Sequence, residues 1–179
     1  YVYDENGNRI AMVDGVIATH YEYDELNRLA VVRDVDGLVV SRYGYDPFNR
    51  RLWKEVEGVR VYFSYSDDGI VGRYSSSGLE MSEYGFWPNV GWDAQRAFIR
   101  INEEYMYFVN DHRGAPVNLV SSSGEVVWSA NYLAYGKADV LVGKDIPIKA
   151  RLPGQHYDEE TDLHYNYFRY YDPRTGTYL

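Results

Sequence analysis

The sequence contains no cysteine, so disulfide bonds are excluded and the fold must be held by strand pairing and packing. No apolar run approaches the roughly 18 residues that a membrane-spanning helix requires. Positive charge is also scarce, because 18 Lys and Arg residues stand against 27 Asp and Glu residues, a formal net charge of -9. Proteins that wrap nucleic acid or lie on anionic lipid need basic patches. We therefore expect neither nucleic acid nor a membrane as the partner.

Helical signal is almost as rare. Only "WDAQRAFIRINEEY", residues 92–105, has the spacing of a short amphipathic helix, and it ends in β-branched residues. The sequence is rich instead in tyrosine, which accounts for 20 of the 179 residues and brings the aromatic content to 17%. Tyrosine, valine and tryptophan favour pleated, half-buried surfaces. This composition favours an all-β fold.

A motif of tyrosine, aspartate, turn residues and arginine recurs about every twenty residues. "YVYDENGNRI" opens the chain, "YEYDELNRL" begins at Tyr21 and "YGYDPFNRRL" begins at Tyr43, and a degenerate copy lies at Tyr65. Such a period indicates a repeat architecture rather than a catalytic centre. The motif residues are Tyr3, Asp4, Arg9, Tyr23, Asp24, Arg28, Tyr45, Asp46 and Arg50.

Each copy of the motif is typical of one β-hairpin. In "YEYD" the two tyrosines point to one face of a strand, and the aspartate ends the strand and accepts a backbone N–H two residues on. Asn27 and Asn49 tolerate the left-handed conformation that closes such a turn. The arginine then pairs with the aspartate across the hairpin, a contact worth about 0 to 1 kcal/mol that fixes register. Since a lone hairpin is marginal, the units are predicted to stack with their tyrosines in ladders. A catalytic or sugar-binding role for the Tyr-Asp pairs is the alternative interpretation.

Beyond Gly78 the period blurs. "EYGFWPNVGW", from Glu83 to Trp92, carries a proline, two glycines and two tryptophans, which indicates an irregular loop or an aromatic ligand-binding patch. Hairpin alternation resumes at Tyr107, and the serines at 121–123 form a polar turn without a nucleophile elbow. We divide the chain into YD-type repeats at 1–78, an irregular aromatic-rich connection at 79–106, degenerate hairpins at 107–147 and a last segment at 148–179.

The last segment contains five possible metal ligands in strict alternation. On a straight strand they would share one face. However, "DEETD" within them is a good turn sequence, which would break the alternation and leave a solvated acidic loop. We expect no metal and no cofactor here. The five residues are His156, Asp158, Glu160, Asp162 and His164.

The same segment carries a specific family resemblance. "RLPGQHYDEETDLHYNYFRYYDPRTGTYL" resembles the Rhs repeat-associated core, and the "YxYDxxNRL" units resemble the YD repeats of Rhs proteins, of Tc toxin C components and of animal teneurins. A bacterial Rhs or Tc-C-like protein is the preferred identification. The residues that carry the core motif are Gly154, Gln155, Tyr157, Asp158, Tyr165, Arg169, Tyr170, Tyr171, Asp172, Pro173 and Gly176.

This resemblance implies a fold and a function. It implies stacked hairpins in a curved, spiralling sheet that forms a hollow shell around a variable C-terminal toxin domain. Relatives release that domain by autoproteolysis and export it through type VI or related secretion systems or within a Tc complex. The implied partners are the remaining shell segments, the toxin domain and a secretion-system or Tc B-component protein. The alternative is an adhesive module that binds glycan or protein through Trp87 and Trp92.

Two positions depart from the family pattern. Asp162 stands where relatives carry Gly, and Thr177 stands where they carry Arg. The self-cleaving "DPxGL" segment is expected beyond Leu179, whereas Asp172 belongs to the preceding "YYDPxTG" motif. Aspartyl chemistry needs two carboxylates with separated pKa values, and no partner is identifiable, so we expect no catalytic residue and no enzymatic activity.

Size and termini complete the expectations. About eight hairpins of twenty residues form a curved patch but cannot enclose a folded toxin domain of about 100 residues. The chain begins inside a repeat, so the natural start and its address signal are expected to lie elsewhere, in a protein that is secreted or delivered to a cell surface. Unpaired sheet edges predict contact with the missing segments or self-association.

Overall fold

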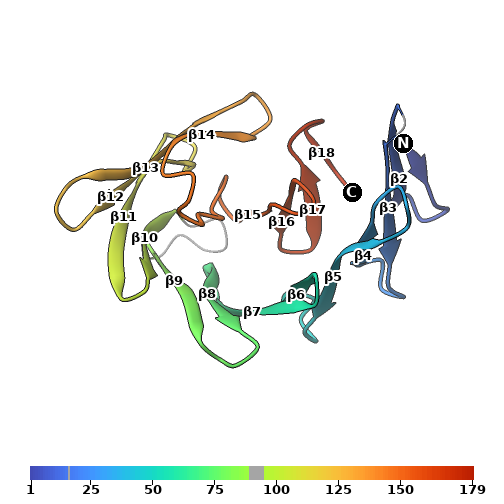
Figure 1. Cartoon of the computed structure of the whole chain (residues 1–179), viewed down its shortest axis with the longest axis horizontal. Helices are drawn as coiled ribbons and strands as arrows, with labels where there is room; N and C mark the ends of the chain where they lie inside the picture. Colours follow the sequence, from blue (N-terminus) through green and yellow to red (C-terminus); the bar gives the residue numbers. More distant parts are fainter. Residues whose placement is uncertain (16, 89–94) are drawn as a thin grey trace.

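The computed structural model describes residues 1–15, 17–88 and 95–179, and its regular elements there are all strands. Fourteen antiparallel strands form one sheet, and each pairs with the next along the chain. Figure 1 shows this sheet curving around a hollow without closing. The described residues contain no helix that is long and apolar enough to cross a membrane. The expected all-β fold with a curved hairpin sheet is therefore confirmed.

The strands of the large sheet, which we call the wall, are β1 (Val2–Tyr3), β2 (Arg9–Asp14), β3 (Ile17–Tyr23), β4 (Leu29–Arg33), β5 (Val39–Tyr45), β6 (Arg51–Val56), β7 (Val59–Ser66), β8 (Gly69–Ser75), β9 (Glu80–Phe86), β10 (Arg96–Ile101), β11 (Glu104–Asn110), β12 (Pro116–Ser121), β13 (Val126–Tyr132) and β14 (Ala138–Val142).

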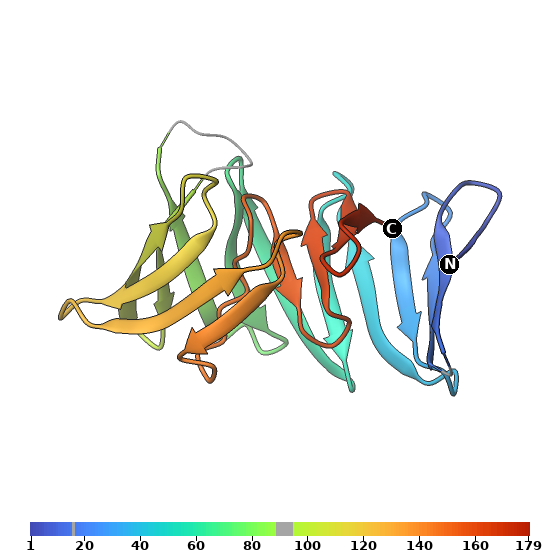
Figure 2. The same cartoon turned by 90° about the horizontal axis from the view of Figure 1, so that it is seen from above.

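A second, four-stranded antiparallel sheet lies in the hollow of the wall (Figures 1 and 2). We call it the inner sheet. Its strands are β15 (His156–Asp158), β16 (Leu163–Asn166), β17 (Arg169–Asp172) and β18 (Thr177–Tyr178). Leu163, Tyr165 and Tyr170 of this sheet share a buried cluster with Tyr43 and Phe63 of the wall. The inner sheet is thus part of the hydrophobic core of the molecule.

A second buried cluster lies under the later wall strands. Ile99, Leu119 and Trp128 of the wall pack with Ile148 and Ala150, which lie between β14 and β15. The chain therefore leaves the last wall strand, crosses the hollow and packs there before it forms the inner sheet (Figure 2). Burial of apolar area against both halves of the wall explains why residues 148–179 occupy the concave side.

One turn design closes most of the hairpins. Asp24 Oδ1 accepts the backbone N–H of Leu26 at 2.9 Å and that of Arg28 at 3.0 Å, and Asn27 takes a φ of 58°. Asp46 and Asn49 repeat this geometry. The side-chain oxygen satisfies two N–H groups that the turn leaves free, and the left-handed residue closes it. The turn that the sequence predicts is the turn that forms.

The tyrosines of the repeat connect successive hairpins. The ladder register shifts at Tyr23, Tyr45 and Tyr65, and such bulges bend and twist a sheet. Each phenol then donates to the carbonyl that follows the turn of the preceding hairpin. These hydrogen bonds are Tyr23 Oη to Arg9 O at 2.9 Å, Tyr45 Oη to Leu29 O at 2.6 Å, Tyr65 Oη to Arg51 O at 2.7 Å and Tyr132 Oη to Pro116 O at 2.9 Å.

Residues 92–105, the one stretch with the spacing of a short helix, form strands in their described part. Residues 96–101 form β10, and β11 starts at Glu104 after a two-residue turn. Phe98 pairs with Gly85 on one side and with Tyr107 on the other, so sheet pairing decides the conformation of this segment. The connection expected to be irregular at 79–106 likewise contains β9 and β10, and the wall continues through it.

Candidate functional site

Buried ion pairs join the inner sheet to the wall, and we call this set of contacts the seam. Asp158 of β15 is fully buried and accepts from both terminal nitrogens of Arg51, with Nη2 at 3.1 Å from Oδ1. Lys54 Nζ lies 2.9 Å from Asp158 Oδ1 and 2.8 Å from Glu160 Oε2. Three charged side chains from β6 and β15 are therefore neutralised inside the protein, and a fourth closes the network from the turn after β15.

The two carboxyl groups of the seam are perturbed in opposite directions. Burial would raise the pKa of Asp158, but the charges of Arg51 and Lys54 hold it below its ordinary value. Burial and the Asp158 charge raise the pKa of Glu160, although Lys54 opposes them. Asp158 is therefore the permanent anion of the seam, and Glu160 is the carboxylate that takes up a proton first on acidification.

Aromatic rings surround the guanidinium of Arg51. The rings of Tyr43, Phe63, Tyr165 and Tyr170 have centroids between 4.3 and 5.7 Å from its Cζ atom. Cation–π attraction strengthens when the cation is removed from water. Two of these rings come from the wall and two from the inner sheet, so Arg51 binds the two sheets together by packing as well as by charge.

A second buried pair fixes the end of the inner sheet. Arg9 Nη1 lies 3.0 Å from Asp172 Oδ2, and Arg9 Nη2 donates to Thr177 Oγ1 at 2.8 Å. Arg174 Nε approaches Asp172 Oδ1 at 2.9 Å. Burial would raise the pKa of Asp172, but hydrogen bonding and charge from Arg174, with help from Arg9, leave it below its ordinary value. Asp172 is thus held ionised by two arginines, and its pair with Arg9 attaches the inner sheet to the wall.

The two histidines of the last segment are buried and neutral. His164 Nδ1 lies 2.7 Å from Gln155 Oε1, and burial together with the charge of Arg151 lowers the pKa of His164 to about 3. His156 has no hydrogen-bond partner at either ring nitrogen among the described residues and lies edge-on to Phe63. Burial, reinforced by nearby cations, holds the pKa of His156 well below its ordinary value.

The acidic stretch that alternates in the sequence is divided by a turn at 159–162. Glu160 is turned back to Lys54, and Asp162 Oδ2 lies 2.7 Å from Lys137 Nζ, so this loop is paired with the wall rather than solvated as expected. Within the described ranges, no group of three or more histidine and carboxylate side chains is arranged to hold a metal ion.

The aspartate–arginine pairs of the second and third motif copies lie at the turns on the rim of the wall, away from the seam. Arg28 Nη2 lies 2.7 Å from Asp24 Oδ2, and Arg50 Nε lies 2.8 Å from Asp46 Oδ2, both in partly exposed pairs. These contacts hold the turns closed, in the way the sequence predicts.

The first copy of the motif differs, because Arg9 does not pair with Asp4 as expected. Asn8 takes that position and binds Asp4 through its backbone and side chain, while Arg9 turns inward to Asp172. The first turn has the same length as the later ones, because the Asp4 N–H donates to Asn8 O as the Asp24 N–H donates to Arg28 O. Arg9 therefore follows the position that Arg28 occupies in the second copy, and alternation along the strand turns its side chain to the concave face.

Some core-motif residues form the seam, and the others make hydrogen bonds and close contacts around it. Gln155, Asp158, Tyr165, Tyr170, Asp172 and Pro173 are buried, and Arg169 is exposed. Tyr157 Oη donates to Asp162 Oδ1 at 3.0 Å, and Tyr171 Oη donates to Tyr135 O at 2.9 Å. Gly176 has a φ of 73°, and a Cβ there would meet the ring of Tyr135 at 2.7 Å. Gly154 has a φ of 76° in the turn before β15.

Sequence reasoning missed two residues on the wall side of the seam, Arg51 and Lys54. Arg51 and Lys54 are fully or largely buried, yet only the preceding Arg50 is part of the motif. The available signal was the doubled arginine in "NRRL", because alternation sends consecutive residues to opposite faces. Of the two tryptophans expected in a binding patch, Trp87 is 56% exposed, and Trp92 lies outside the described residues.

Comparison with known proteins gives a consistent set of relatives. A family model described as RHS protein matches residues 106–140. Over 177 residues the chain is 29% identical to double-stranded DNA deaminase toxin A of Burkholderia cenocepacia, a match that covers 93% of this chain and 12% of that protein. It is 28% identical to the tRNA nuclease WapA of Bacillus subtilis over 180 residues, 99% of this chain and 8% of that protein. The chain thus spans a small part of the length of these relatives.

Solved structures show the same fold. A Tc holotoxin pore of Photorhabdus luminescens aligns with a TM-score of 0.71 and 16% identity over 98% of this chain and 9% of the matched chain. The complex TcdB2-TccC3 aligns with a TM-score of 0.69 and 16% identity, covering 98% of this chain and 10% of that one. At this identity the likeness concerns the fold, a curved β wall with a sheet in its hollow.

Proposed function

Since the chain belongs to the Rhs family, with a role of the toxin-associated shell type, we propose that it is a wall segment of a shell that encloses a C-terminal toxin domain. The observation that carries this proposal is the curvature of the wall around a hollow in which the inner sheet is already docked. A concave sheet with a buried core on its inner side is suited to separate an interior from the solvent.

The edges of the wall support a larger assembly. β1 and β14 each pair with one neighbour only among the described strands. Val2 and Tyr3 at one edge and Leu141 and Val142 at the other are exposed. Unpaired edges with exposed apolar residues favour pairing with further strands. We propose that these edges continue into neighbouring wall segments of a longer polypeptide, and that an isolated chain self-associates through them.

We propose that the segments of the chain have two structural roles. Residues 1–78, 79–106 and 107–147 supply the wall, and residues 148–179 supply the core segment that anchors its interior. The seam residues are all engaged in structural ion pairs, which supports a chain without catalytic activity of its own. Self-cleavage, and delivery by a secretion system or with a Tc B-type partner, belong to the longer polypeptide.

Protease protection tests the shell proposal. In the longer polypeptide that carries this segment and a toxin domain, the toxin domain should resist a protease concentration that digests it rapidly when it is expressed alone. Replacement Arg51→Met in the seam should increase its digestion, because the inner sheet loses its anchor, whereas the matched rim variant Arg50→Met should not. Equal digestion of the enclosed and free toxin domain would overturn the proposal.

An adhesive module is the second candidate, and one observation favours it. Trp53, Tyr62 and Tyr74 pair directly across β6, β7 and β8 and form a partly exposed aromatic row on the convex face. Flat aromatic surfaces suit sugar rings. A glycan array with the wild-type chain and with Trp53→Ala and Trp87→Ala variants tests it: glycan binding that either variant abolishes would support adhesion, and absence of binding would dismiss it.

A further inference from the structure

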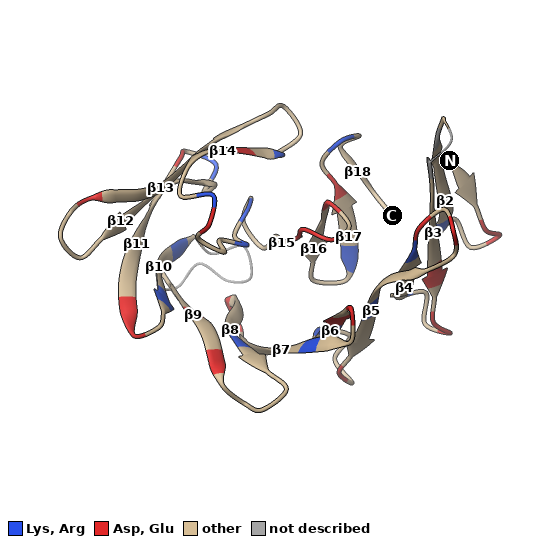
Figure 3. Ribbon diagram, viewed as in Figure 1, with Lys and Arg blue, Asp and Glu red and all other residues tan. Residues whose placement is uncertain are grey.

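The buried charges of this acidic protein are mostly positive. The whole chain carries 18 basic and 27 acidic residues, but the described buried side chains include seven basic and only two acidic ones. The basic positions of β6, β8, β10 and 149–151 border the hollow in Figure 3. The buried charged residues are Arg9, Arg51, Lys54, Arg73, Arg96, Lys149, Arg151, Asp158 and Asp172.

Three of the seven buried cations have no carboxylate partner among the described residues. Arg73 makes no ion pair there, and its buried Nε has no hydrogen-bond partner. Arg96 Nη2 reaches only the carbonyl of Gln155, at 3.2 Å, and its Nε is also unpartnered. Arg151 Nη1 donates only to the carbonyls of Ile148 and Ala150. Such groups carry a desolvation cost that a bound anion would offset.

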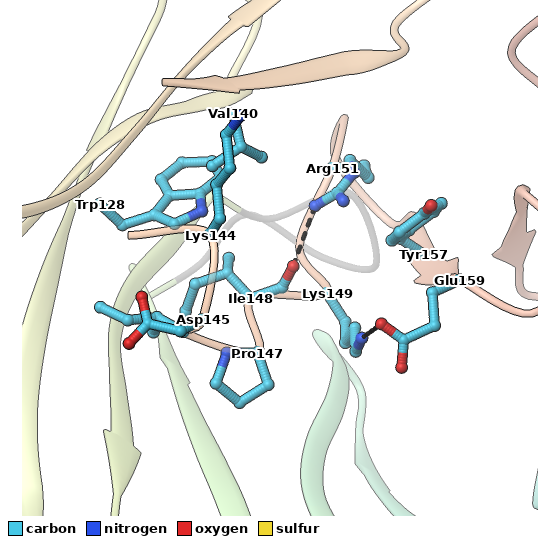
Figure 4. Close-up of a pocket in the computed structure, with 11 residues that line it drawn as sticks. Trp128, Val140, Lys144, Asp145, Pro147, Ile148, Lys149, Arg151, Tyr157 and Glu159 are labelled. Atoms are coloured by element: carbon cyan, nitrogen blue, oxygen red, sulfur yellow. Dashed lines mark hydrogen bonds and ion pairs between the residues drawn. The ribbon is translucent and has the colours of Figure 1, made fainter. Parts of the chain in front are cut away.

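Two cavities open onto Arg151 and Arg73, one onto each, and they share one ion pair. One, of about 210 Å³, is lined by the cations Lys144, Lys149 and Arg151 and by the carboxylates Asp145 and Glu159 (Figure 4). The other, also about 210 Å³, is lined by the cations Lys54, Arg73 and Lys149 and by the carboxylates Glu159 and Glu160. Lys149 Nζ contacts Glu159 Oε2 at 2.6 Å between them.

Glu159 shows what kind of group the cavities accept. It lies on the turn after β15, its side chain is 68% exposed, and its carboxylate is the only one that reaches Lys149 among the described residues. Burial lowers the pKa of Lys149, and the neighbouring cations Arg73 and Lys54 act in the same direction. The Glu159 carboxylate of the chain itself thus already neutralises Lys149 from the solvent side, while Arg73 and Arg151 have no carboxylate partner among the described residues.

We propose that Arg73, Lys149 and Arg151 form a binding site for an acidic peptide segment, with one carboxylate in each cavity and Glu159 as the internal group that the ligand displaces. Each cavity is lined by three cations and two carboxylates, and this excess of cations selects for anions. The two small adjoining cavities fit alternate side chains on one face of an extended peptide rather than a folded domain. The site stands independently of the shell proposal, because it depends only on contacts within this chain.

Fluorescence anisotropy with labelled hexaglutamate tests the site at low salt, with labelled hexaglutamine as the neutral probe. The wild-type chain should bind hexaglutamate and not hexaglutamine. Lys149→Gln and Arg73→Gln should each weaken binding by about tenfold, the loss expected for one charge-assisted contact. Arg60→Gln is the matched control, because Arg60 pairs with Glu55 on the convex face.

Glu159→Gln supplies a test that does not depend on loss of binding. Removing the competing carboxylate should tighten hexaglutamate binding by about threefold or more, and this exposed position tolerates the change. Hexaglutamate should also raise the melting temperature of the wild-type chain. Unchanged affinity in Lys149→Gln and Glu159→Gln, an equal loss in Arg60→Gln, or competition by inorganic phosphate at the same concentration as peptide carboxylate would each overturn the proposal.

Discussion

Removal of the Asp158 charge should destabilise the protein far more than removal of a rim carboxylate. In Asp158→Asn the guanidinium of Arg51 stays buried among aromatic rings but loses its counter-charge. Breaking a buried pair by removing one partner costs about 3 to 5 kcal/mol, and the asparagine oxygen still accepts a hydrogen bond, so we expect about 3 kcal/mol. That is a large part of the 5 to 15 kcal/mol typical of a domain.

Asp24→Asn is the matched control. Asp24 also faces an arginine at 2.7 Å, but the pair is partly exposed, and such pairs contribute about 0 to 1 kcal/mol. Urea unfolding followed by tryptophan fluorescence gives both free energies of unfolding, because Trp128 is buried in the core. Equal losses in the two variants would refute the account of the seam.

A double replacement separates the charge from the packing. Arg51→Met with Asp158→Leu removes both charges and keeps apolar volume, and such exchanges are often neutral or stabilising. We therefore expect the double variant to be more stable than Asp158→Asn alone. A double variant that is as unstable as the sum of two single losses would show that packing geometry, and not unpaired charge, governs the seam.

Three further predictions follow from the interior contacts. Because His156 and His164 are held neutral in the fold, the unfolded chain binds more protons than the folded chain below pH 6.5. As the pH is lowered through this range, the free energy of unfolding should fall by up to about 1.4 kcal/mol per pH unit for each histidine. His156→Leu should reduce this slope, as measured by urea titrations at pH 7.5 and 5. An unchanged slope would contradict the prediction. Gly44→Ala places a Cβ 2.2 Å from the Trp53 ring and should lower the stability in thermal unfolding by about 1 to 3 kcal/mol. Adding Trp53→Ala should recover this loss, whereas additive losses of stability in the double variant would exclude the clash. Tyr45→Phe removes a 2.6 Å hydrogen bond between hairpins and should cost about 1 kcal/mol, and a neutral result would deny the tyrosine ladder a stabilising role.

The hairpins of the wall could be predicted from the sequence because their contacts are local. Asp24 binds backbone groups two and four residues on, so composition and spacing determine the turn. The helical spacing of residues 92–105 was ambiguous because the contacts that decide their conformation are not local. A short apolar pattern fits both periods, and only pairing with β9 and β11 selects the strand.

The seam could not be predicted in the same way, since its partners are far apart in the chain. Arg51 and Asp158 are separated by 107 residues and Arg9 and Asp172 by 163. Alternation assigns each arginine to a face but does not identify which face is concave. The family resemblance identified Asp158 and Asp172 as motif positions, and only the fold shows that they neutralise arginines of the wall.

A cryo-EM reconstruction of the longer polypeptide that carries this segment tests whether the chain is a wall segment of a toxin shell. In that reconstruction β1 and β14 should pair with further strands, the wall should continue in the same curvature, and density for a toxin domain should lie on the side of the inner sheet. A compact, separate domain with both edges in solvent and no enclosed density would contradict the shell proposal.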